Sequence, residues 1–430
     1  MMRPLLLLGT ALALTSCARG GDAPEQQTGA DPRLPAINQY LVPPMHVAGI
    51  APWNGAVPTA AAGLHVAAFA DGFKNVRSVY VLPNGDVLAV EPKGPSEPVT
   101  RPKDIVVNFI QGFGHSKVGG GNRITLLRDT NGDGRADMRS VLIDGLNAPF
   151  GVALVGNDLY VADTDAILRF PYTAGQTRIT APGQVLTPLP GGPIDHHWTK
   201  SLVASADGSK LYVGIGSNSN ITENGVEAER DRARIWEVDR ATGAHRDYAT
   251  GLRNPNGLSF HPETHQLWTV VNERDELGPD LVPDYLTSVR PGAFYGWPYS
   301  YWGQHADPRV RPQRPDMVAR AIPADYSLSS HVAPLGLAFS YAGSLPAAYR
   351  SGAFVGEHGS WDRGHLNGYK VVYIPFAAGH PSGKPVDVLT GFIDGNGKAR
   401  GRPVAIAIDR GGGLLVVDDV GNVVWRVTGA

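Results

Sequence analysis

The sequence contains a single cysteine, Cys17, and has almost no excess of charge of either sign. One cysteine excludes a disulfide bond within the chain. Lysine and arginine together number 38, and aspartate and glutamate number 40, which gives a formal net charge of −2. Proteins that bind nucleic acid through its phosphates need a basic surplus, so the composition argues against a nucleic-acid partner.

The chain has little room for long helices, because 53 glycines and 35 prolines make up about a fifth of its 430 residues. Both residue types interrupt helices. This composition excludes an all-α protein and favours a β-rich fold with many turns. Apolar residues account for 42% of the chain, which is enough for a large core and excludes disorder throughout.

The apolar run near the N-terminus, Leu5 to Leu14, is too short to span a bilayer as a permanent helix. It leads into LTSC, which ends at Cys17 and resembles the lipobox of bacterial lipoproteins. The resemblance implies a signal peptide over residues 1–17 and a periplasmic, lipid-anchored protein. Ala18 in place of an aspartate implies the outer membrane, with the lipid as the chain's membrane contact. The alternative is an ordinary secretory signal with an incidental cysteine.

Residues 18–60 are rich in Ala, Gly, Pro and Gln, a composition that predicts a flexible tether. After the tether, one unit recurs six times: an apolar strand, a polar turn, and a second short strand rich in Leu, Tyr, Trp and Val. The copies occupy residues 78–91, 151–163, 201–216, 257–273, 336–359 and 404–419.

Each copy has the alternation and the turn residues of a β-hairpin. The copies start about 50 to 80 residues apart, which leaves room for two further strands after each hairpin. Six four-stranded sheets arranged radially form a propeller. We therefore predict an all-β fold, with residues 61–430 as a six-bladed β-propeller. Unrelated hairpins in a sandwich are the alternative.

The stretch DTNGDGRAD places four oxygen-bearing side chains at nearly alternate positions of a tight loop: Asp129, Asn131, Asp133 and Asp137. Ca²⁺ prefers six to eight oxygen ligands, and such a loop can point its side chains inward. An EF-hand would need a glutamate where Ser140 stands, so the loop is not an EF-hand. We predict a structural calcium loop, and a solvated Asp/Gly turn is the alternative.

Two further stretches, and several single arginines, carry residue types that suit catalysis or the binding of an anion. HHWTK contains His197, and an imidazole can remove a hydroxyl proton near neutral pH. GLRNPNGLSF contains Arg253 and Asn254 directly before a predicted strand. Several guanidinium groups at one place need an anionic partner. The arginines expected to converge at one end of the central channel are Arg253, Arg363, Arg400 and Arg402.

These motifs give the chain a resemblance to the soluble glucose dehydrogenase and sorbosone dehydrogenase family of quinoproteins. The resemblance covers most of residues 70–428. It is specific at HWTK with LVASADG, at GLRNPNGLSF, at ELGPD and at RGRPVAIAIDRGG. The resemblance is nearer to the sorbosone or pyranose branch of the family, through the stretches AFYGWPYSYWG, EHGSWDRG and GYKVV. The resemblance implies a six-bladed propeller that holds pyrroloquinoline quinone (PQQ) and Ca²⁺.

The resemblance also implies roles for individual residues. His197 matches the general base. Arg253 and Asn254 match the pair that holds the quinone, and Gly278 and Pro279 match the positions whose carbonyls bind Ca²⁺.

Arg363 falls where the family has a basic residue near the quinone carboxylates, and Arg400 with Arg402 match an Arg-x-Arg pair of the last blade. Trp198, Thr199 and Lys200 replace the run that usually follows the histidine in the glucose enzymes, so the sugar pocket is not carried over. The role of His331 is open.

The implied reaction is the oxidation of an aldose or an aldehyde sugar. His197 would take the proton of the C1 hydroxyl as hydride leaves C1 for the quinone C5, with Ca²⁺ as the Lewis acid. The electron acceptor is unknown, with a cytochrome or the quinone pool as candidates. Two alternatives stay open: a Ca²⁺-dependent propeller lactonase, and a non-enzymatic propeller that binds glycans or proteins at the cell surface.

Overall fold

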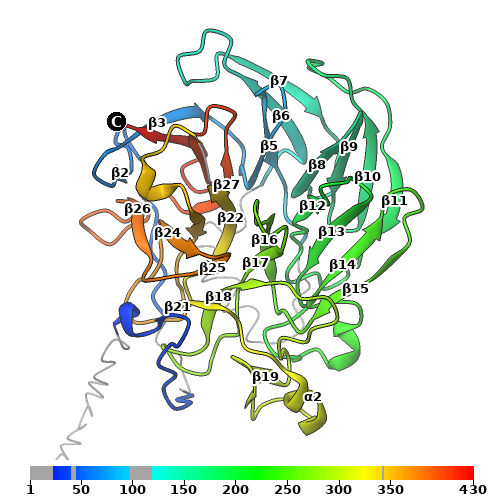
Figure 1. The fold of residues 1–430 in the computed structure, drawn as a ribbon, viewed down its shortest axis with the longest axis vertical. Coiled ribbons are helices and arrows are strands. Elements are labelled where there is room, and N and C mark those ends of the chain that lie inside the picture. The colour runs from blue at the N-terminus through cyan, green and yellow to red at the C-terminus, as the bar shows by residue number, and fades with distance from the viewer. Residues whose placement is uncertain (1–22, 40–44, 97–118, 341–342) are drawn as a thin grey trace, which may run out of the picture.

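The computed structural model describes residues 23–39, 45–96, 119–340 and 343–430, and it confirms the all-β, six-bladed propeller. Six antiparallel sheets surround a central channel (Figure 1). The innermost strand of each blade contacts the innermost strands of both neighbouring blades, so the ring is closed. The predicted signal peptide, residues 1–17, lies outside the described residues.

Blades 1 to 3 each have four strands, which follow one another outward from the channel in chain order. Blade 1 consists of β4 (Ser78–Val81), β5 (Val87–Glu91), β6 (Arg123–Arg128) and β7 (Met138–Ile143). Blade 2 consists of β8 (Gly151–Val155), β9 (Asp158–Ala162), β10 (Ala166–Pro171) and β11 (Gln184–Pro188). Blade 3 consists of β12 (Leu202–Ala204), β13 (Lys210–Ile215), β14 (Arg234–Asp239) and β15 (His245–Thr250).

Blades 4 and 5 have the same four-stranded plan, and each gains a short outer strand from the N-terminal part of the chain. Blade 4 consists of β16 (Pro255–Phe260), β17 (Leu267–Val271), β18 (Pro283–Ser288), β21 (Tyr326–Ser330) and β1 (Thr28–Gly29). Blade 5 consists of β22 (Pro334–Ser340), β23 (Gly352–Glu357), β24 (Lys370–Ala377), β26 (Val386–Thr390) and β2 (Thr59–Ala60). The short strand β25 (His380–Pro381) pairs with β24.

Blade 6 joins the two ends of the propeller. It consists of β27 (Pro403–Ile408), β28 (Leu414–Asp418), β29 (Val423–Gly429) and, as its outermost strand, β3 (Leu64–Asp71). The blue β3 lies against the C-terminal strand in Figure 1, and the pairing runs from Leu64 opposite Gly429 to Asp71 opposite Val423. The last blade is therefore complete only when the start of the domain is in place.

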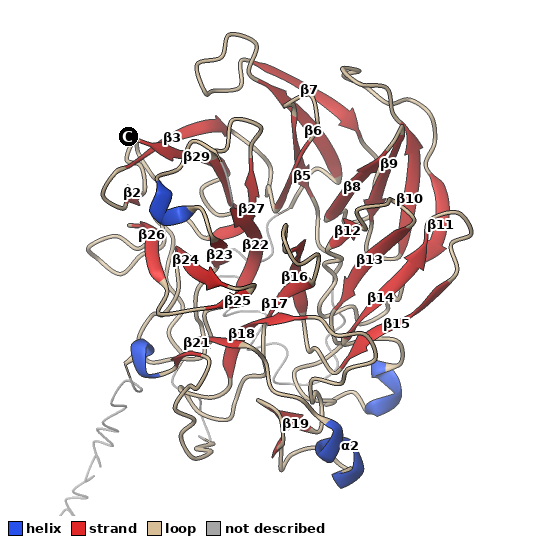
Figure 2. Cartoon of the chain, viewed as in Figure 1, coloured by secondary structure: helices blue, strands red, loops and turns tan. Residues whose placement is uncertain are grey.

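Helices contribute little, and they lie at the periphery (Figure 2). The helical segments of the described chain are η1 (Pro24–Gln26), η2 (Val226–Glu229), α2 (Pro315–Arg320) and η3 (Ala347–Tyr349). A two-stranded hairpin, β19 (Ser300–Tyr301) with β20 (His305–Ala306), precedes α2 in an insertion of blade 4. Among the described residues, no helix is long and apolar enough to cross a membrane.

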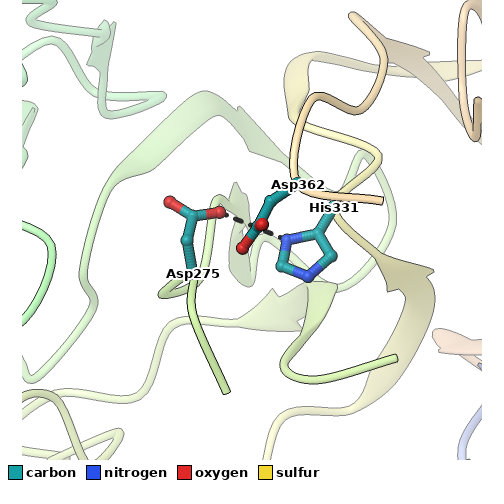
Figure 3. A group of neighbouring side chains, drawn as sticks. All are labelled: Asp275, His331 and Asp362. Carbon is teal, nitrogen blue, oxygen red and sulfur yellow. Dashed lines mark hydrogen bonds and ion pairs between the residues drawn. The ribbon is translucent and has the colours of Figure 1, made fainter. Parts of the chain in front are cut away.

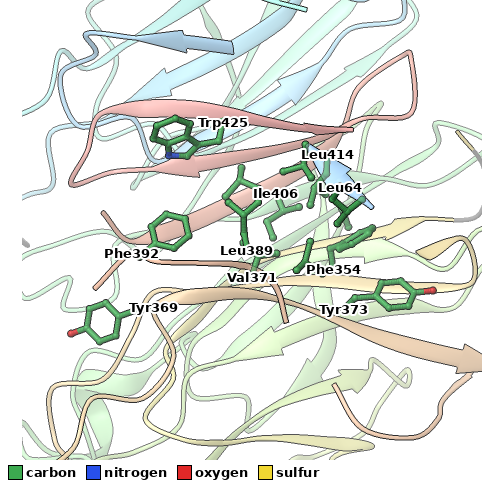
Figure 4. Close-up of a cluster of buried hydrophobic side chains, with 14 of the residues drawn as sticks. Leu64, Phe354, Tyr369, Val371, Tyr373, Leu389, Phe392, Ile406, Leu414 and Trp425 are labelled. Atoms are coloured by element: carbon green, nitrogen blue, oxygen red, sulfur yellow. The ribbon is translucent and has the colours of Figure 1, made fainter. Parts of the chain in front are cut away.

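The repeated sequence unit corresponds to the first two strands of every blade, as predicted. The second strand of a blade packs against both neighbouring blades, so it is buried on both faces. All five residues of β5, β17 and β28 are buried. This position explains why these strands read as continuous apolar runs rather than as alternating ones. Figure 4 shows one of the resulting cores, between blades 5 and 6, with Phe354, Leu389 and Trp425 among its members.

Part of the segment predicted to be a tether packs on the propeller instead. β1 pairs with β21 and β2 pairs with β26. Trp53 is 9% exposed, and its ring lies edge-on to Phe392 and Trp425 at centroid distances of 5.6 and 5.1 Å. Its Nε1–H donates a hydrogen bond of 2.8 Å to Asp418. Aromatic burial and strand pairing thus hold residues that the composition alone had marked as flexible.

We expect Trp53→Ala to lower the free energy of unfolding by about 3–5 kcal/mol, the usual loss for a buried large aromatic residue. Val57, which is 50% exposed, supplies the control, and Val57→Ala should change stability by less than about 0.5 kcal/mol. Urea unfolding, followed by the far-ultraviolet circular dichroism of the backbone, measures the free energy of unfolding of both variants. Equal, small effects of the two substitutions would mean that the segment does not pack as described.

Candidate functional site

The blades bring their functional residues to one end of the channel, which we call the mouth. Paired strands of a hairpin are antiparallel, so the first strand begins where the second one ends. The segments that precede β4, β8, β12, β16, β22 and β27 therefore meet those that follow β5, β9, β13, β17, β23 and β28. The residues predicted from HHWTK, GLRNPNG and RGRP all precede first strands, which places them at the mouth.

His197 lies before β12 and is held by one neighbouring residue. Its Nδ1 is 2.9 Å from the Ser217 carbonyl oxygen and 3.0 Å from the Ser217 hydroxyl. A carbonyl oxygen only accepts hydrogen bonds, so Nδ1 carries the proton and Nε2 keeps its lone pair. Burial, together with the charges of Arg253 and His196, holds the pKa of His197 well below its usual value. The imidazole is therefore neutral at neutral pH, as a base must be.

A buried ionic group supports the loop that carries His197. Asp195 accepts a hydrogen bond of 2.7 Å from Arg232, and Lys200 Nζ lies 3.7 Å from the same carboxylate. Lys200 also donates to the Trp198 carbonyl at 2.9 Å. Burial lowers the pKa of Lys200 to about 8. These contacts fix both ends of the HHWTK loop, and they explain why a lysine stands in a fully buried position.

Arg253 is buried at the start of β16, and most of its guanidinium is already engaged. It donates to the Glu273 carbonyl at 2.8 Å and to the Asn220 carbonyl at 3.1 Å. Its Nη2 lies 3.5 Å from the Asp275 carboxylate. The guanidinium therefore fixes the loop after β17 and places a positive charge beside His197.

Asn254, the next residue, is buried, and its Oδ1 has no hydrogen-bond partner within the described chain. Gly216 allows this arrangement, because a Cβ there would collide with His197 and would stand 2.5 Å from Asn254 Oδ1. An unpaired buried amide oxygen costs about 1–3 kcal/mol unless something else binds it. The amide is thus poised to contact a ligand at the mouth.

Two carboxylates and an imidazole form a compact group between blades 4 and 5 (Figure 3). Asp275 follows β17, His331 precedes β22, and Asp362 follows β23. One ligand atom from each lies within 4.8 Å of the others. His331 Nδ1 is 3.2 Å from Asp275, and its Nε2 is 3.2 Å from the Gly278 carbonyl oxygen.

The electrostatics of this group are those of a small anionic site that holds one proton. Burial lowers the pKa of His331, but the hydrogen bond with Asp275 and the charge of Asp362 outweigh it and raise this pKa to about 9. Burial raises the pKa of Asp362 to about 6. An imidazolium with both nitrogens donating to oxygens satisfies the geometry. The oxygen-rich surroundings would equally suit a hard metal cation.

Gly278 and Pro279, the predicted metal ligands, lie beside this group. The Gly278 carbonyl accepts from His331, and the Pro279 carbonyl accepts a hydrogen bond of 3.0 Å from Ser330 Oγ. Their proposed metal role stays a prediction. The sequence reasoning missed Asp275 and Asp362, although Asp275 directly precedes ELGPD and Asp362 stands in EHGSWDRG, two of the stretches that carry the resemblance.

The part of the mouth formed by blades 5, 6 and 1 holds further cationic groups. Arg402 is buried over the Tyr369 ring, 5.0 Å from its centroid, and donates to the Tyr369 hydroxyl at 3.2 Å. Arg77 forms an ion pair of 2.6 Å with Asp419, which also lies 3.1 Å from His358. Arg77 and His358 were not singled out from the sequence.

Two nitrogens on this side are buried and unpaired. Within the described ranges, neither Arg402 Nε nor Arg77 Nε has a hydrogen-bond partner. Both are donors, whereas the unpaired atom of Asn254 is an acceptor. A ligand with anionic oxygens at one end and a donor at the other would satisfy all three atoms.

All four arginines that were predicted to converge stand in segments of the mouth, before β16 and β27 or after β23. Their partners differ. Arg363 binds Ser330 Oγ at 2.8 Å and forms an ion pair of 3.0 Å with Asp280. The Arg400 backbone N–H donates to the Phe392 carbonyl at 2.7 Å, a contact that leaves the predicted role of its side chain untested.

The predicted calcium loop lies away from the mouth. It joins β6 to β7, and third strands run from the mouth toward the opposite end of the blade. The oxygens of Asp129 accept hydrogen bonds from the backbone N–H groups of Gly132 and Gly134, at 2.7 and 2.8 Å. The loop's remaining predicted ligands, which likewise bind groups of the loop itself, are Asn131, Asp133 and Asp137. Calcium binding at this loop stays a prediction.

Comparison with known proteins identifies a family that the chain matches. The family model described as TrAA12-like matches residues 115–285 and 315–430, which together make up about two thirds of the chain. An uncharacterised protein of Borreliella burgdorferi is 27% identical over 292 residues, which cover 66% of this chain and 76% of the relative.

Solved structures with the same fold share little sequence with the chain. The PQQ domain of a pyranose dehydrogenase from Coprinopsis cinerea has a TM-score of 0.69 at 20% identity, covering 86% of this chain and 97% of that domain. A family AA12 carbohydrate-active enzyme of Trichoderma reesei gives 0.70 at 18% identity, with coverages of 91% and 100%. A PQQ-bound aldose sugar dehydrogenase of Streptomyces coelicolor gives 0.55 at 15% identity, with coverages of 86% and 99%.

These structures agree with the propeller, and they are neighbours of the kind that the sequence motifs resemble. The narrower placement in the sorbosone or pyranose branch stays a prediction. The family model matches more than half of the sequence and includes the segments that carry His197, Arg253, Asp275, His331 and Arg402. The chain belongs to the TrAA12-like family.

Proposed function

We propose that the chain is a PQQ- and Ca²⁺-dependent oxidoreductase that oxidises an aldose or an aldehyde sugar at the mouth. The observation that carries this proposal is a set of three buried polar atoms that have no hydrogen-bond partner among the described residues and that belong to segments meeting at the mouth: Asn254 Oδ1, Arg402 Nε and Arg77 Nε. Buried polar atoms are almost always paired in folded proteins. Three unpaired ones at the mouth indicate that a polar ligand completes the site.

PQQ fits these residues by the chemistry of its groups. It carries carboxylates, which Arg402 and Arg77 can bind through charge-assisted hydrogen bonds. It also carries a ring N–H, which can donate a hydrogen bond to Asn254 Oδ1. The carboxylates of Asp275 and Asp362 and the carbonyls of Gly278 and Pro279 supply the oxygen donors that Ca²⁺ prefers. Among the similar structures, the Coprinopsis cinerea protein is a PQQ domain and the Streptomyces coelicolor enzyme is PQQ-bound, which supports the assignment.

The chain's own part in the reaction follows from the geometry at His197. Ser217 keeps the proton on Nδ1, so Nε2 can accept the proton of a substrate hydroxyl. Burial and the Arg253 charge keep the imidazole neutral before the reaction, and the Asp195 group keeps its loop in place. When bound, PQQ would accept the electrons that the sugar loses. The physiological electron acceptor would be a cytochrome or the quinone pool.

One observation favours a second candidate, a Ca²⁺-dependent lactonase. Such an enzyme would hold calcium with carboxylate side chains, and Asp275 with Asp362 provide two of them. It would have no use for Arg402 and Arg77 around the mouth. Hydrolysis of lactones by the protein with Ca²⁺ and without quinone would favour this candidate.

Reconstitution tests the proposed activity directly. Purified protein supplied with PQQ and Ca²⁺ should reduce an artificial dye in the presence of an aldose or an aldehyde sugar, and removal of Ca²⁺ by a chelator should abolish the reaction. Dye reduction is followed by absorbance over a broad panel of sugars. Tight PQQ binding without activity on any sugar would reduce the proposal to cofactor binding alone.

The division of labour between His197 and Arg253 predicts two different phenotypes. His197→Ala should lower kcat by roughly 10²–10⁴ and leave PQQ affinity nearly unchanged. Arg253→Ala should mainly weaken PQQ binding, because it removes the contacts that hold the loop with Asp275 in place. His245→Ala, at an exposed position on β15, is the control and should change neither. Loss of PQQ in both variants, without a purely catalytic defect, would contradict the assignment.

The lowered pKa of His197 also predicts how kcat depends on pH. The base is active when neutral, and its pKa lies well below the usual histidine value, so kcat should stay at its plateau as pH falls through 6.5. A fall of kcat centred near 6.5, absent in His197→Ala, would show that His197 is not held in the neutral form.

We also propose that Cys17 anchors the protein to the outer membrane on its periplasmic side. The support is the lipobox-like LTSC sequence. Cys17→Ala should release the protein from the membrane fraction, because the lipid is the anchor that the sequence provides. Fractionation with immunoblotting measures this, with Cys17→Ser as a second variant that also cannot be acylated through sulfur. Continued sedimentation of both variants with membranes would contradict the lipid anchor.

A further inference from the structure

The N-terminal strap, which we define as residues 23–39 and 45–51, runs over the loops that carry the mouth residues. The Asn38 backbone N–H donates to the Leu277 carbonyl at 2.9 Å, in the loop that contains Asp275. The His46 backbone N–H donates to the Trp361 carbonyl at 3.0 Å, next to Asp362. In Figure 1 the dark blue start of the chain lies beside β21.

Gln27 is the residue through which the strap reaches deepest. It is 1% exposed, and its Oε1 accepts hydrogen bonds from Ser329 Oγ at 2.9 Å, Ser330 Oγ at 3.0 Å and Arg363 Nη1 at 3.4 Å. Its Nε2 donates to the Asp280 carbonyl at 3.3 Å. The Gln27 carbonyl also accepts from the Ser327 hydroxyl.

These partners stand next to the members of the carboxylate and imidazole group. Ser330 directly precedes His331, and Arg363 directly follows Asp362. Asp280 ends the loop that begins near Asp275, and its side chain is itself paired with Arg363. One buried amide thus connects the three segments that must keep a fixed spacing for the group in Figure 3 to exist.

We propose that the N-terminal strap is part of the binding site, with Gln27 as a positioning residue that sets the distance of Asp362 from Asp275 and His331. The inference rests on the proposed function only in naming the ligand, since the placement of the loops follows from the contacts alone. If the N-terminal strap only stabilised the fold, it would do so through the backbone of β1, which pairs with β21 at Thr28 and Gly29. Gln27 acts through its side chain and across to blade 5.

Loss of the Gln27 amide should loosen the loops with His331 and Asp362 and leave the rest of blade 4 unchanged. Without Gln27 Oε1, the Ser329 hydroxyl loses its buried acceptor, the Ser330 hydroxyl is left with the Pro279 carbonyl as its acceptor, and one bond of the Arg363 guanidinium is lost. Unsatisfied buried groups are relieved by local movement of the chain that carries them. The segments that can move are the ends of β21 and β23, where the loops with His331 and Asp362 begin.

The test compares three variants of the full chain. Gln27→Met keeps the side-chain volume and removes the hydrogen bonds. Gln26→Met is the matched control, because Gln26 is the adjacent, exposed glutamine. Gln27→Glu keeps the accepting oxygen and tests for rescue. The measurements are hydrogen–deuterium exchange of peptides covering residues 275–282 and 358–364, and the Kd for PQQ in the presence of Ca²⁺.

We expect faster exchange in both peptides for Gln27→Met, no change for Gln26→Met, and near-native exchange for Gln27→Glu. The Kd for PQQ should rise about 10–100-fold in Gln27→Met, as it does when partners that orient ligands are removed. Faster exchange in a protein that binds no PQQ in any form would support the positioning role and refute the proposed cofactor. Exchange that is unchanged, or raised equally in all of blade 4, would overturn the inference.

Discussion

The pairing of β3 with β29 is the contact on which the arrangement of the site depends. Blade 6 takes its outermost strand from the start of the domain and its other three from the end. This ladder closes the ring, and a closed ring sets the positions of all six hairpins around one channel. The mouth consists of loop ends from separate blades, so its geometry is a property of the closed ring and of no single blade.

The mouth holds two groups of ionic side chains. Asp275 and Asp362 lie between blades 4 and 5, with His331 and Arg253 as cationic neighbours. Arg402 and Arg77 belong to blades 6 and 1, and Asp419 is the carboxylate partner of Arg77. His197 precedes blade 3 as a neutral base. A ligand that bears carboxylates at one end and binds a cation at the other matches these two groups.

The sequence was sufficient for the hairpins and insufficient for the contacts that join distant segments. Alternating apolar residues and turn signals are local features, so all six hairpins and the propeller could be predicted. The packing of residues 23–39 and 45–60 could not, because Gln27 is held by hydrogen bonds to residues some 300 positions away and leaves no apolar pattern. Composition alone therefore suggested a tether where the structure has a strap. Arg363 illustrates the same limit: its charge was visible, but its partners Asp280 and Ser330 were not.

The central claim is that a quinone with carboxylate groups binds to the buried atoms of Asn254, Arg402 and Arg77 that have no partner among the described residues. Isothermal titration of PQQ into the protein with Ca²⁺ present tests it most directly. The account predicts one saturable site per chain, with an affinity that falls when Arg402 and Arg77 are both replaced by methionine. Titration curves without saturation, or binding that persists unchanged when both Arg402 and Arg77 are replaced by methionine, would contradict it.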